Sequence, residues 1–561
     1  MRLHPLLSLL PFLPQTLASC EPEIPFLPPT YTPTSLTPVF KEITTAINSL
    51  ISNGIFNSTS FSVSIASRDT PLYSINHASQ DTSLPVNGST AYRIASNTKL
   101  FTALGILQEE AAGRLSLDDR ITKYIPALRG KGKGKGKINW EGITLRTLLA
   151  HLSGLPDDYA EDDLVLSLAD PTVVGLPPVT AAEEAELPSC EGFSDYEVAC
   201  TATDLLDWVQ DASPVFPPRV EVSYSNVGFD LLGLVLAKIS NTTYEKYIER
   251  AILQPLNLTG TSFTPPASGI VVEDSYWGVD MGSGNPSGGL YSTPTDMITF
   301  LQHALTHANS ITPALNWFLP AAYSSGSHSY LGYPWEIFRS PAILPNSTRS
   351  VTLNTKSGGL IGYYTYSFIV PVYDLVIFMG VAGDLTGLNQ LLDTVVDPVI
   401  VGAEVLAQGQ LADTYSGRYV SSDTGLNSSL TLSHSMQQSL YISEWVSNGT
   451  DVLAALIPLV ADQAGTGENI YFQMMPTFET RVANGSVGEV WRLINVMEGN
   501  GGDTEVRGNA TSIWADYCVS NIDPLSYAGL PLNEAVFWRA GNDTAVAEVE
   551  LSAFRVVLAK Q

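Results

Sequence analysis

Arg93-Ile94-Ala95-Ser96-Asn97-Thr98-Lys99 stands at the start of a run that is apolar on nearly all sides as far as Ala111. Such a run predicts a helix buried in a core, ended by Gly113, with Ser96 at its N-terminus, where the helix dipole favours an anionic oxygen. Of the eleven lysines, only Lys99 has a serine three residues before it. Both side chains therefore project from one helix face, and an amine held against a serine hydroxyl can help to remove its proton. The stretch predicts a nucleophilic serine.

Two further motifs occur once each in the chain. Among the 24 tyrosines, only Tyr224 is followed two residues later by asparagine, Asn226. Among the lysines, only Lys356 is followed by a hydroxyl residue and a glycine, in Lys356-Ser357-Gly358-Gly359. Either motif alone would be weak evidence, so their order along the chain, after the serine motif, is what carries information.

Serine β-lactamases and penicillin-binding proteins use three motifs of these kinds in this order. The chain resembles that family, in the branch of class C β-lactamases and DD-peptidases, whose second motif is Tyr-x-Asn. Residues 148–155, 224–263 and 288–297 resemble other segments of the family, and the resemblance extends over residues 45–405. It implies an α+β fold, in which helices flank an antiparallel sheet and a second lobe is entirely helical.

The resemblance implies a role for four side chains. Ser96 would be the nucleophile, and Lys99 and Tyr224 would together move the serine proton to the leaving group. Lys356 would offer positive charge to a substrate carboxylate or to the transition state. A tyrosine and a lysine in contact share their protons, so the identity of the base stays open between them.

Further residues are implied to bind the substrate. The backbone N–H groups of Ser96 and Gly359 would form the oxyanion hole, and Asn226 would hydrogen-bond the acyl amide. Ser357 and Gly358 would also line the site, the glycine because a side chain there would collide as the strand approaches the substrate. His151 is expected to be structural, since the chemistry of the family uses no histidine.

Three functions are compatible with these motifs. The first is a serine hydrolase that acts on an amide, ester or lactam through a Ser96 acyl-enzyme. The second is an acyltransferase or transesterase that tailors a small-molecule metabolite, and the third is an inactive binding protein on the same fold. No cofactor and no metal are expected. An α/β-hydrolase is disfavoured because the chain has no Gly-x-Ser-x-Gly.

Bulk properties limit the partners. The chain has 561 residues, of which 44% are hydrophobic, and a net charge of −28. This length predicts more than one domain, and the acidic balance argues against nucleic acids and anionic membrane surfaces. The expected partner is a small-molecule or short-peptide acyl substrate, with no membrane span and no obligate protein partner.

Composition divides the chain into segments. We predict a signal peptide over residues 1–19, a proline-rich arm over 20–44, the β-lactamase-like domain over 45–405 and an all-β domain over 406–561. The last would be a barrel or a sandwich, because short alternating segments are separated there by Gly, Asn and Asp turns. An appended domain of this kind resembles that of fungal secreted β-lactamase-like proteins.

An acidic insertion over residues 156–218 interrupts the catalytic domain. No lysine or arginine occurs between Arg146 and Arg219, while fourteen acidic residues fall between Asp157 and Asp207. Two interpretations stay open: a solubilising surface excursion, or a lid that disfavours anionic substrates.

The N-terminus predicts export. Arg2 precedes a leucine-rich core that is too short to span a bilayer, and Ala18 and Ser19 offer cleavage sites. The residues before Cys20 also fit a bacterial lipobox, a minor alternative. Ten Asn-x-Ser/Thr sequons favour a glycosylated, secreted eukaryotic protein, of fungal origin by the resemblance. They are Asn57, Asn87, Asn241, Asn257, Asn346, Asn427, Asn448, Asn484, Asn509 and Asn542.

The four cysteines of a secreted chain predict two disulfides. Cys190 and Cys200 lie close together in the sequence and are expected to pair, which leaves Cys20 with Cys518. Three connectivities are possible.

Overall fold

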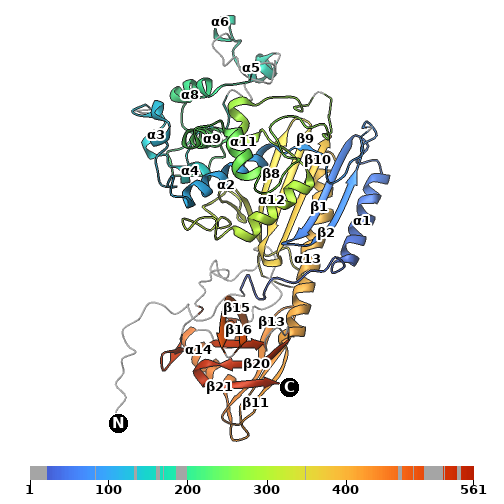
Figure 1. The fold of residues 1–561 in the computed structure, drawn as a ribbon, viewed down its shortest axis with the longest axis vertical. Coiled ribbons are helices and arrows are strands. Elements are labelled where there is room, and N and C mark those ends of the chain that lie inside the picture. Colours follow the sequence, from blue (N-terminus) through green and yellow to red (C-terminus); the bar gives the residue numbers. More distant parts are fainter. Residues whose placement is uncertain are drawn as a thin grey trace. The chain divides into compact units, whose positions relative to one another are not determined.

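The computed structural model describes residues 22–561, apart from residues 83, 132–135, 160–163, 169, 185–198, 274, 346, 348, 465–469, 484, 498–521, 523–524 and 540–544. The described residues form two compact units. The first comprises residues 31–340 and 352–399, and the second comprises residues 22–30, 341–351 and 400–561. Figure 1 shows the elements of both units along the chain.

An eight-stranded sheet forms the centre of the first unit. Its strand order is β2-β1-β10-β9-β8-β7-β6-β5, and neighbouring strands from β2 to β8 run antiparallel. The strands are β1 (Thr59–Ser67), β2 (Pro71–His77), β5 (Ala322–Tyr323), β6 (Ser329–Leu331), β7 (Glu336–Ser340), β8 (Val351–Leu360), β9 (Tyr363–Val370) and β10 (Leu375–Gly383).

The apolar stretch from 366 to 382 illustrates why the sequence folds this way. Pro371 cannot continue a central strand, and Asp374 adopts a left-handed φ of 56°. The two residues end β9 and start β10, which are joined by a short 3-10 turn. The stretch therefore forms two buried strands joined by a turn.

Helices cover the sheet. Helix α12 (Pro294–His307) packs on β1, β9 and β10. Helix α1 (Thr37–Ser52) lies beside β2, and the ring of Phe40 stacks on that of Tyr73 with centroids 4.8 Å apart. The long helix α13 (Leu388–Tyr415) contains residues of both units, and the predicted boundary between residues 405 and 406 falls inside it.

A helical lobe completes the first unit. Helix α2 (Thr98–Ala111) is buried from Thr98 to Leu107, as expected of a core helix, and it packs on α9 and α11. Two short strands, β3 (Tyr92–Arg93) and β4 (Tyr291–Ser292), pair beside it. The other helices are α3 (Ile121–Tyr124), α4 (Leu145–Leu149), α5 (Leu164–Ser167), α6 (Ala181–Glu184), α8 (Ala202–Asp211), α9 (Asn226–Ser240), α10 (Tyr244–Ile248) and α11 (Asn285–Gly288).

The second unit contains a closed antiparallel barrel. Eight strands follow the order β12-β11-β21-β20-β19-β16-β15-β13, and β12 pairs with β13 to close the ring. Because the ring is closed, the domain is a barrel and not a sandwich, the two forms that the sequence left open. The strands are β11 (Gly417–Ser421), β12 (Ser429–Ser435), β13 (Ser439–Ser447), β15 (Ile470–Ala483), β16 (Ser486–Met497), β19 (Glu534–Arg539), β20 (Val546–Leu551) and β21 (Val556–Lys560).

Smaller elements accompany the barrel. The short strand β14 (Thr450–Asp451) pairs with β13 and leads into helix α14 (Val452–Ala464), and β17 (Ser526–Tyr527) pairs with β18 (Leu530–Pro531). Among the described residues, no helix is long and apolar enough to cross a membrane.

The cysteine predictions fall mainly outside the described residues. Cys200 is disulfide-bonded. Cys20, Cys190 and Cys518 all lie outside the described residues, so the predicted pairing stays a prediction.

Candidate active site

Ser96 lies in a single 3-10 turn, η1 (Ala95–Asn97), directly before helix α2. The preceding Ala95 has a φ of 47°, in the left-handed region that alanine rarely adopts. Strained backbone of this kind persists only where the surrounding structure enforces it, and it clusters at functional sites. Asn97 and Lys99 are buried, whereas Ser96 is only partly buried. The turn therefore leaves the serine partly accessible at the start of a buried helix.

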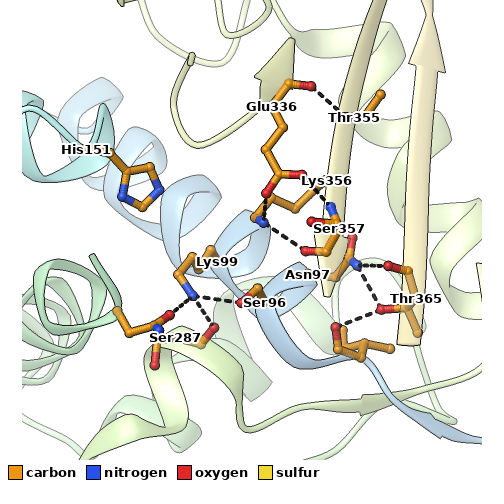
Figure 2. Close-up of polar contacts among 12 residues, drawn as sticks. Ser96, Asn97, Lys99, His151, Ser287, Glu336, Thr355, Lys356, Ser357 and Thr365 are labelled. Atoms are coloured by element: carbon orange, nitrogen blue, oxygen red, sulfur yellow. Dashed lines mark hydrogen bonds and ion pairs between the residues drawn. The ribbon is translucent and has the colours of Figure 1, made fainter. Parts of the chain in front are cut away.

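Lys99 is fully buried and meets three oxygen atoms (Figure 2). Its Nζ lies 3.1 Å from Ser96 Oγ and 2.8 Å from the carbonyl oxygen of Ser287. It also donates to Oδ1 of Asn226. An ammonium group has three N–H donors, and here each has an acceptor. In this arrangement Lys99 donates a hydrogen bond to the serine oxygen, which leaves the task of accepting the serine proton to another group.

Tyr224 is the group placed to accept that proton. The ammonium groups of Lys356 and Lys99 and the hydroxyl of Ser96 all act on its phenol to lower its pKa. The Nζ atoms of Lys99 and Lys356 lie 5.0 and 5.2 Å from the centroid of its ring. Burial acts to raise the pKa of Tyr224, but the two ammonium groups outweigh it, so the pKa lies below its ordinary value.

His151 supports Tyr224 from behind. The two rings stack with their centroids 4.4 Å apart, and Nδ1 of His151 accepts a hydrogen bond of 3.1 Å from the backbone N–H of Ser225. Burial, together with Lys99 and Lys356, holds the pKa of His151 well below its ordinary value. The imidazole is therefore neutral, which agrees with the expected structural role.

Lys356, on β8, is buried and forms an ion pair with Glu336 at the start of β7. Its Nζ also lies 2.8 Å from the carbonyl oxygen of Ser357, and the N–H of Ser357 donates to Oε2 of Glu336 at 2.8 Å. Burial acts to raise the pKa of Glu336, yet the charge and hydrogen bonds of Lys356 lower it below its ordinary value. The positive charge predicted to meet a substrate carboxylate is thus already paired inside the protein.

Asn226 bridges Lys99 and the acidic insertion. Its Nδ2 donates to Oδ1 of Asp158 at 2.6 Å, and its backbone N–H donates to the carbonyl oxygen of Asp157 at 2.8 Å. The first residues of the insertion therefore touch the site. Residues 160–163, 169 and 185–198 of the insertion lie outside the described residues, so the choice between excursion and lid stays open.

Gly358 is required by the protein's own backbone. A Cβ atom there would lie 2.3 Å from the carbonyl oxygen of Ile94 and 2.8 Å from Oγ1 of Thr365. Oγ1 of Thr365 in turn donates to that carbonyl oxygen at 2.9 Å and accepts a bond of the same length from Nδ2 of Asn97. The glycine lets β8 approach the turn that carries Ser96, which differs from the expected reason, an approach of the strand to the substrate.

The structure thus brings together Ser96, Lys99, Tyr224, Asn226 and Lys356 from the three motifs. Ser357 is adjacent and partly buried, and Gly359 is exposed at the end of β8. The oxyanion-hole role of the backbone N–H groups stays a prediction. In the described part of the chain there is no group of three or more His, Cys, Asp or Glu side chains able to hold a metal ion.

The chain is similar to several known proteins. A family model described as Beta-lactamase matches residues 57–393, and one described as Beta-lactamase-like-like, C-terminal domain, matches residues 407–561. Over 560 residues the chain is 36% identical to the "Probable hydrolase M10" of Phoma sp., covering 97% of this chain and 91% of that protein.

Two more proteins are similar. The "Probable hydrolase clz13" of Cochliobolus lunatus is 34% identical over 579 residues, with coverage of 97% of this chain and 91% of that protein. A solved class C β-lactamase is 18% identical with a TM-score of 0.47, covering 66% of this chain and 95% of that chain.

Proposed function

The chain belongs to the β-lactamase family, and we propose that it is a secreted serine hydrolase that cleaves an amide, ester or lactam through an acyl-enzyme on Ser96. The observation that carries the proposal is the position of the Ser96 hydroxyl. It lies 3.1 Å from Nζ of Lys99 and interacts with the phenol of Tyr224, whose pKa two ammonium groups lower.

Tyr224 starts the reaction as the phenolate. It takes the proton of Ser96 while Oγ attacks the substrate carbonyl, forming the C–O bond of a tetrahedral intermediate. The N–H groups of Ser96 and Gly359 stabilise its oxyanion, and such donors contribute about 3 to 4 kcal/mol each. Collapse breaks the bond to the leaving group, which takes the proton back from Tyr224. Water then attacks the acyl-enzyme by the same proton route in reverse, releasing the acid and free Ser96.

The test is intact-mass spectrometry of the protein with a fluorogenic β-lactam, a p-nitrophenyl ester and a D-Ala-D-Ala peptide. We expect at least one donor to leave a mass adduct that maps to the peptide containing Ser96. An adduct mapped to any other residue, or turnover without involvement of Ser96, would refute the proposal.

Glu336 tunes this chemistry, because its charge acts to raise the pKa of Tyr224. In Glu336→Gln that influence is gone, so the pKa of Tyr224 falls further. Since the phenolate is the active form, activity rises with pH through this pKa. We expect the acid limb of the kcat/KM profile to move to lower pH, measured with the p-nitrophenyl ester. Glu336→Asp keeps the charge and is the control; an unmoved limb in Glu336→Gln would exclude Tyr224 as the titrating base.

Export as a glycoprotein is the second part of the proposal. The structure describes six of the ten sequon asparagines, and every one of them is exposed, as a glycan requires. They are Asn57, Asn87, Asn241, Asn257, Asn427 and Asn448; the other four, Asn346, Asn484, Asn509 and Asn542, lie outside the described residues. We expect the protein from a fungal host to lose mass on treatment with an N-glycan endoglycosidase. A mass equal to the bare chain in that host would contradict it.

A further inference from the structure

The two ammonium groups beside Ser96 are covered by the protein. Lys99 is fully buried, and the side chain of Lys356 is 1% exposed. The acidic side chains next to them are more accessible: that of Glu336 is 29% exposed, and Asp158 is also partly exposed. A substrate that approaches the serine therefore meets accessible negative charge, whereas the positive charge of the site is buried.

Glu336 occupies the partner position of Lys356. The resemblance implies that a substrate carboxylate binds this lysine, but Oε1 of Glu336 is already paired with its Nζ, and Oε2 accepts from the N–H of Ser357 at 2.8 Å (Figure 2). Lys356 lowers the pKa of Glu336, so the carboxylate is charged at neutral pH. A substrate carboxylate would have to displace Glu336 or share one ammonium with it, and like charges side by side repel.

Asp158 occupies the partner position of Asn226 in the same way. The resemblance implies that Asn226 hydrogen-bonds the acyl amide of the substrate. Its Oδ1 instead accepts from Lys99, and its Nδ2 donates to Oδ1 of Asp158 at 2.6 Å. An acyl amide would have to compete with this charge-assisted bond. At each of the two positions expected to hold a substrate group, a carboxylate of the protein is therefore bound instead.

These carboxylates can still accept hydrogen bonds from a cation. An ionised carboxylate has about four lone-pair sites, and the bonds of Glu336 to Lys356 and Ser357 use one on each oxygen. At longer range, the acidic insertion adds fourteen acidic residues between Asp157 and Asp207 and no lysine or arginine. Charge of one sign around a site raises the local concentration of oppositely charged molecules.

We propose that the site selects an acyl substrate that carries a protonated amine and rejects one that carries a carboxylate, with Glu336 and Asp158 as the residues that determine this specificity. The proposal rests on the proposed hydrolysis through Ser96 and names the class of substrate for it. The amine of the substrate donates to one or both carboxylates, and the acyl carbon lies at Ser96.

The test compares three p-nitrophenyl esters that differ only at the end of the acyl chain: the 6-aminohexanoate with an ammonium, the heptanoate with a methyl group and the pimelate monoester with a carboxylate. The value of kcat/KM is measured for each, with Ser96→Ala giving the background. We expect the order ammonium, methyl, carboxylate, with the first and last about tenfold apart or more. The difference should shrink in about 1 M NaCl, which screens charges beyond about 3 Å.

The Glu336→Gln variant locates the selectivity. The ratio of kcat/KM between the ammonium and carboxylate esters should fall by about threefold or more, because one of the two carboxylates is lost. This ratio cancels the change in the pKa of Tyr224, since all three esters use the same base. Glu336→Asp keeps the charge and should keep the preference for the ammonium ester. Glu141→Gln, which removes the same charge from an exposed ion pair with Arg120, should leave the ratio unchanged.

Asp158→Asn provides a second, independent variant, which also serves if Glu336→Gln fails to fold, judged by thermal unfolding. The new amide keeps an oxygen that can accept from Asn226 and removes only the charge. The same ratio should fall in this variant too.

The outcomes separate this proposal from the hydrolase itself. If none of the three esters acylates Ser96, the proposed hydrolysis fails, and the selectivity fails with it. If the esters do acylate Ser96 but react equally fast, or the methyl or carboxylate ester reacts fastest, the hydrolase stands and the selectivity is overturned. A ratio that stays unchanged in both Glu336→Gln and Asp158→Asn, or that falls as much in Glu141→Gln, would also overturn it.

Discussion

The Ser96→Ala variant is expected to form no covalent adduct with any acyl donor that modifies the wild-type protein, and its turnover should fall to the uncatalysed background. The reason is chemical: alanine has no atom that can attack a carbonyl, so the covalent route is closed and not merely slowed. Intact-mass spectrometry and ester turnover on matched samples measure both effects. Persisting turnover in this variant would show that another nucleophile, or directly activated water, carries the reaction.

The same variant should fold normally. Lys99 loses one acceptor but keeps the oxygens of Asn226 and Ser287, so no bare ammonium is left buried. The free energy of unfolding should change by no more than about 1 kcal/mol. Ser357→Ala is a suitable control for the effect on stability, since it also removes one hydroxyl from this region and leaves the nucleophile in place. A variant that is inactive because it is unfolded would lose its thermal transition, which separates a structural effect from a chemical one.

The spacing of Ser96 and Lys99 was predictable because it is local. Three residues on a helix fix two side chains on one face, and the apolar run to Ala111 requires burial of that helix. Tyr224 and Lys356 are different. No local periodicity brings a residue just before α9 and one from β8 to the turn that carries Ser96, so their place could be inferred only from the family resemblance.

Glu336 was missed for a related reason. It is one of 56 acidic residues, and nothing in its neighbourhood distinguishes it. It becomes part of the site because β7 lies beside β8 in the sheet, which sets its carboxylate against Lys356. Strand order is a property of the whole sheet. A sequence can therefore reveal the lysine of the motif while leaving its counter-ion hidden.

The barrel illustrates the same limit for the fold. Alternating segments such as 429–433 and 490–496 predict strands, and both lie in strands, β12 and β16. The alternation is the same in a sandwich and in a barrel, since each has one inward face. The difference is a single pairing, β12 with β13, that closes the ring. Non-local closure of this kind leaves no mark on the pattern of either strand.

The second large effect is expected in Tyr224→Phe. The variant keeps the ring, and with it the stacking on His151 and the contacts with both lysines. It loses only the hydroxyl, the group that accepts and returns the proton. Positioned acid–base groups contribute about 10² to 10⁴ in rate, so kcat should fall by that range while the protein still binds its substrate. Single-turnover kinetics with the p-nitrophenyl ester, monitored for the acyl-enzyme, measure the step directly.

The control for this effect is Tyr244→Phe. Tyr244 is buried, and its hydroxyl hydrogen-bonds with Thr102 in the helical lobe. Its loss should cost about 1 kcal/mol of stability and leave kcat within a few-fold of wild type. If Tyr224→Phe behaved like this control, Lys99 would have to accept the serine proton itself. Lys99 would then have to exchange the hydrogen bond that it donates to Ser96 for one that it accepts. The paired measurement therefore decides which member of the tyrosine–lysine pair is the base, a question that the motifs alone leave open.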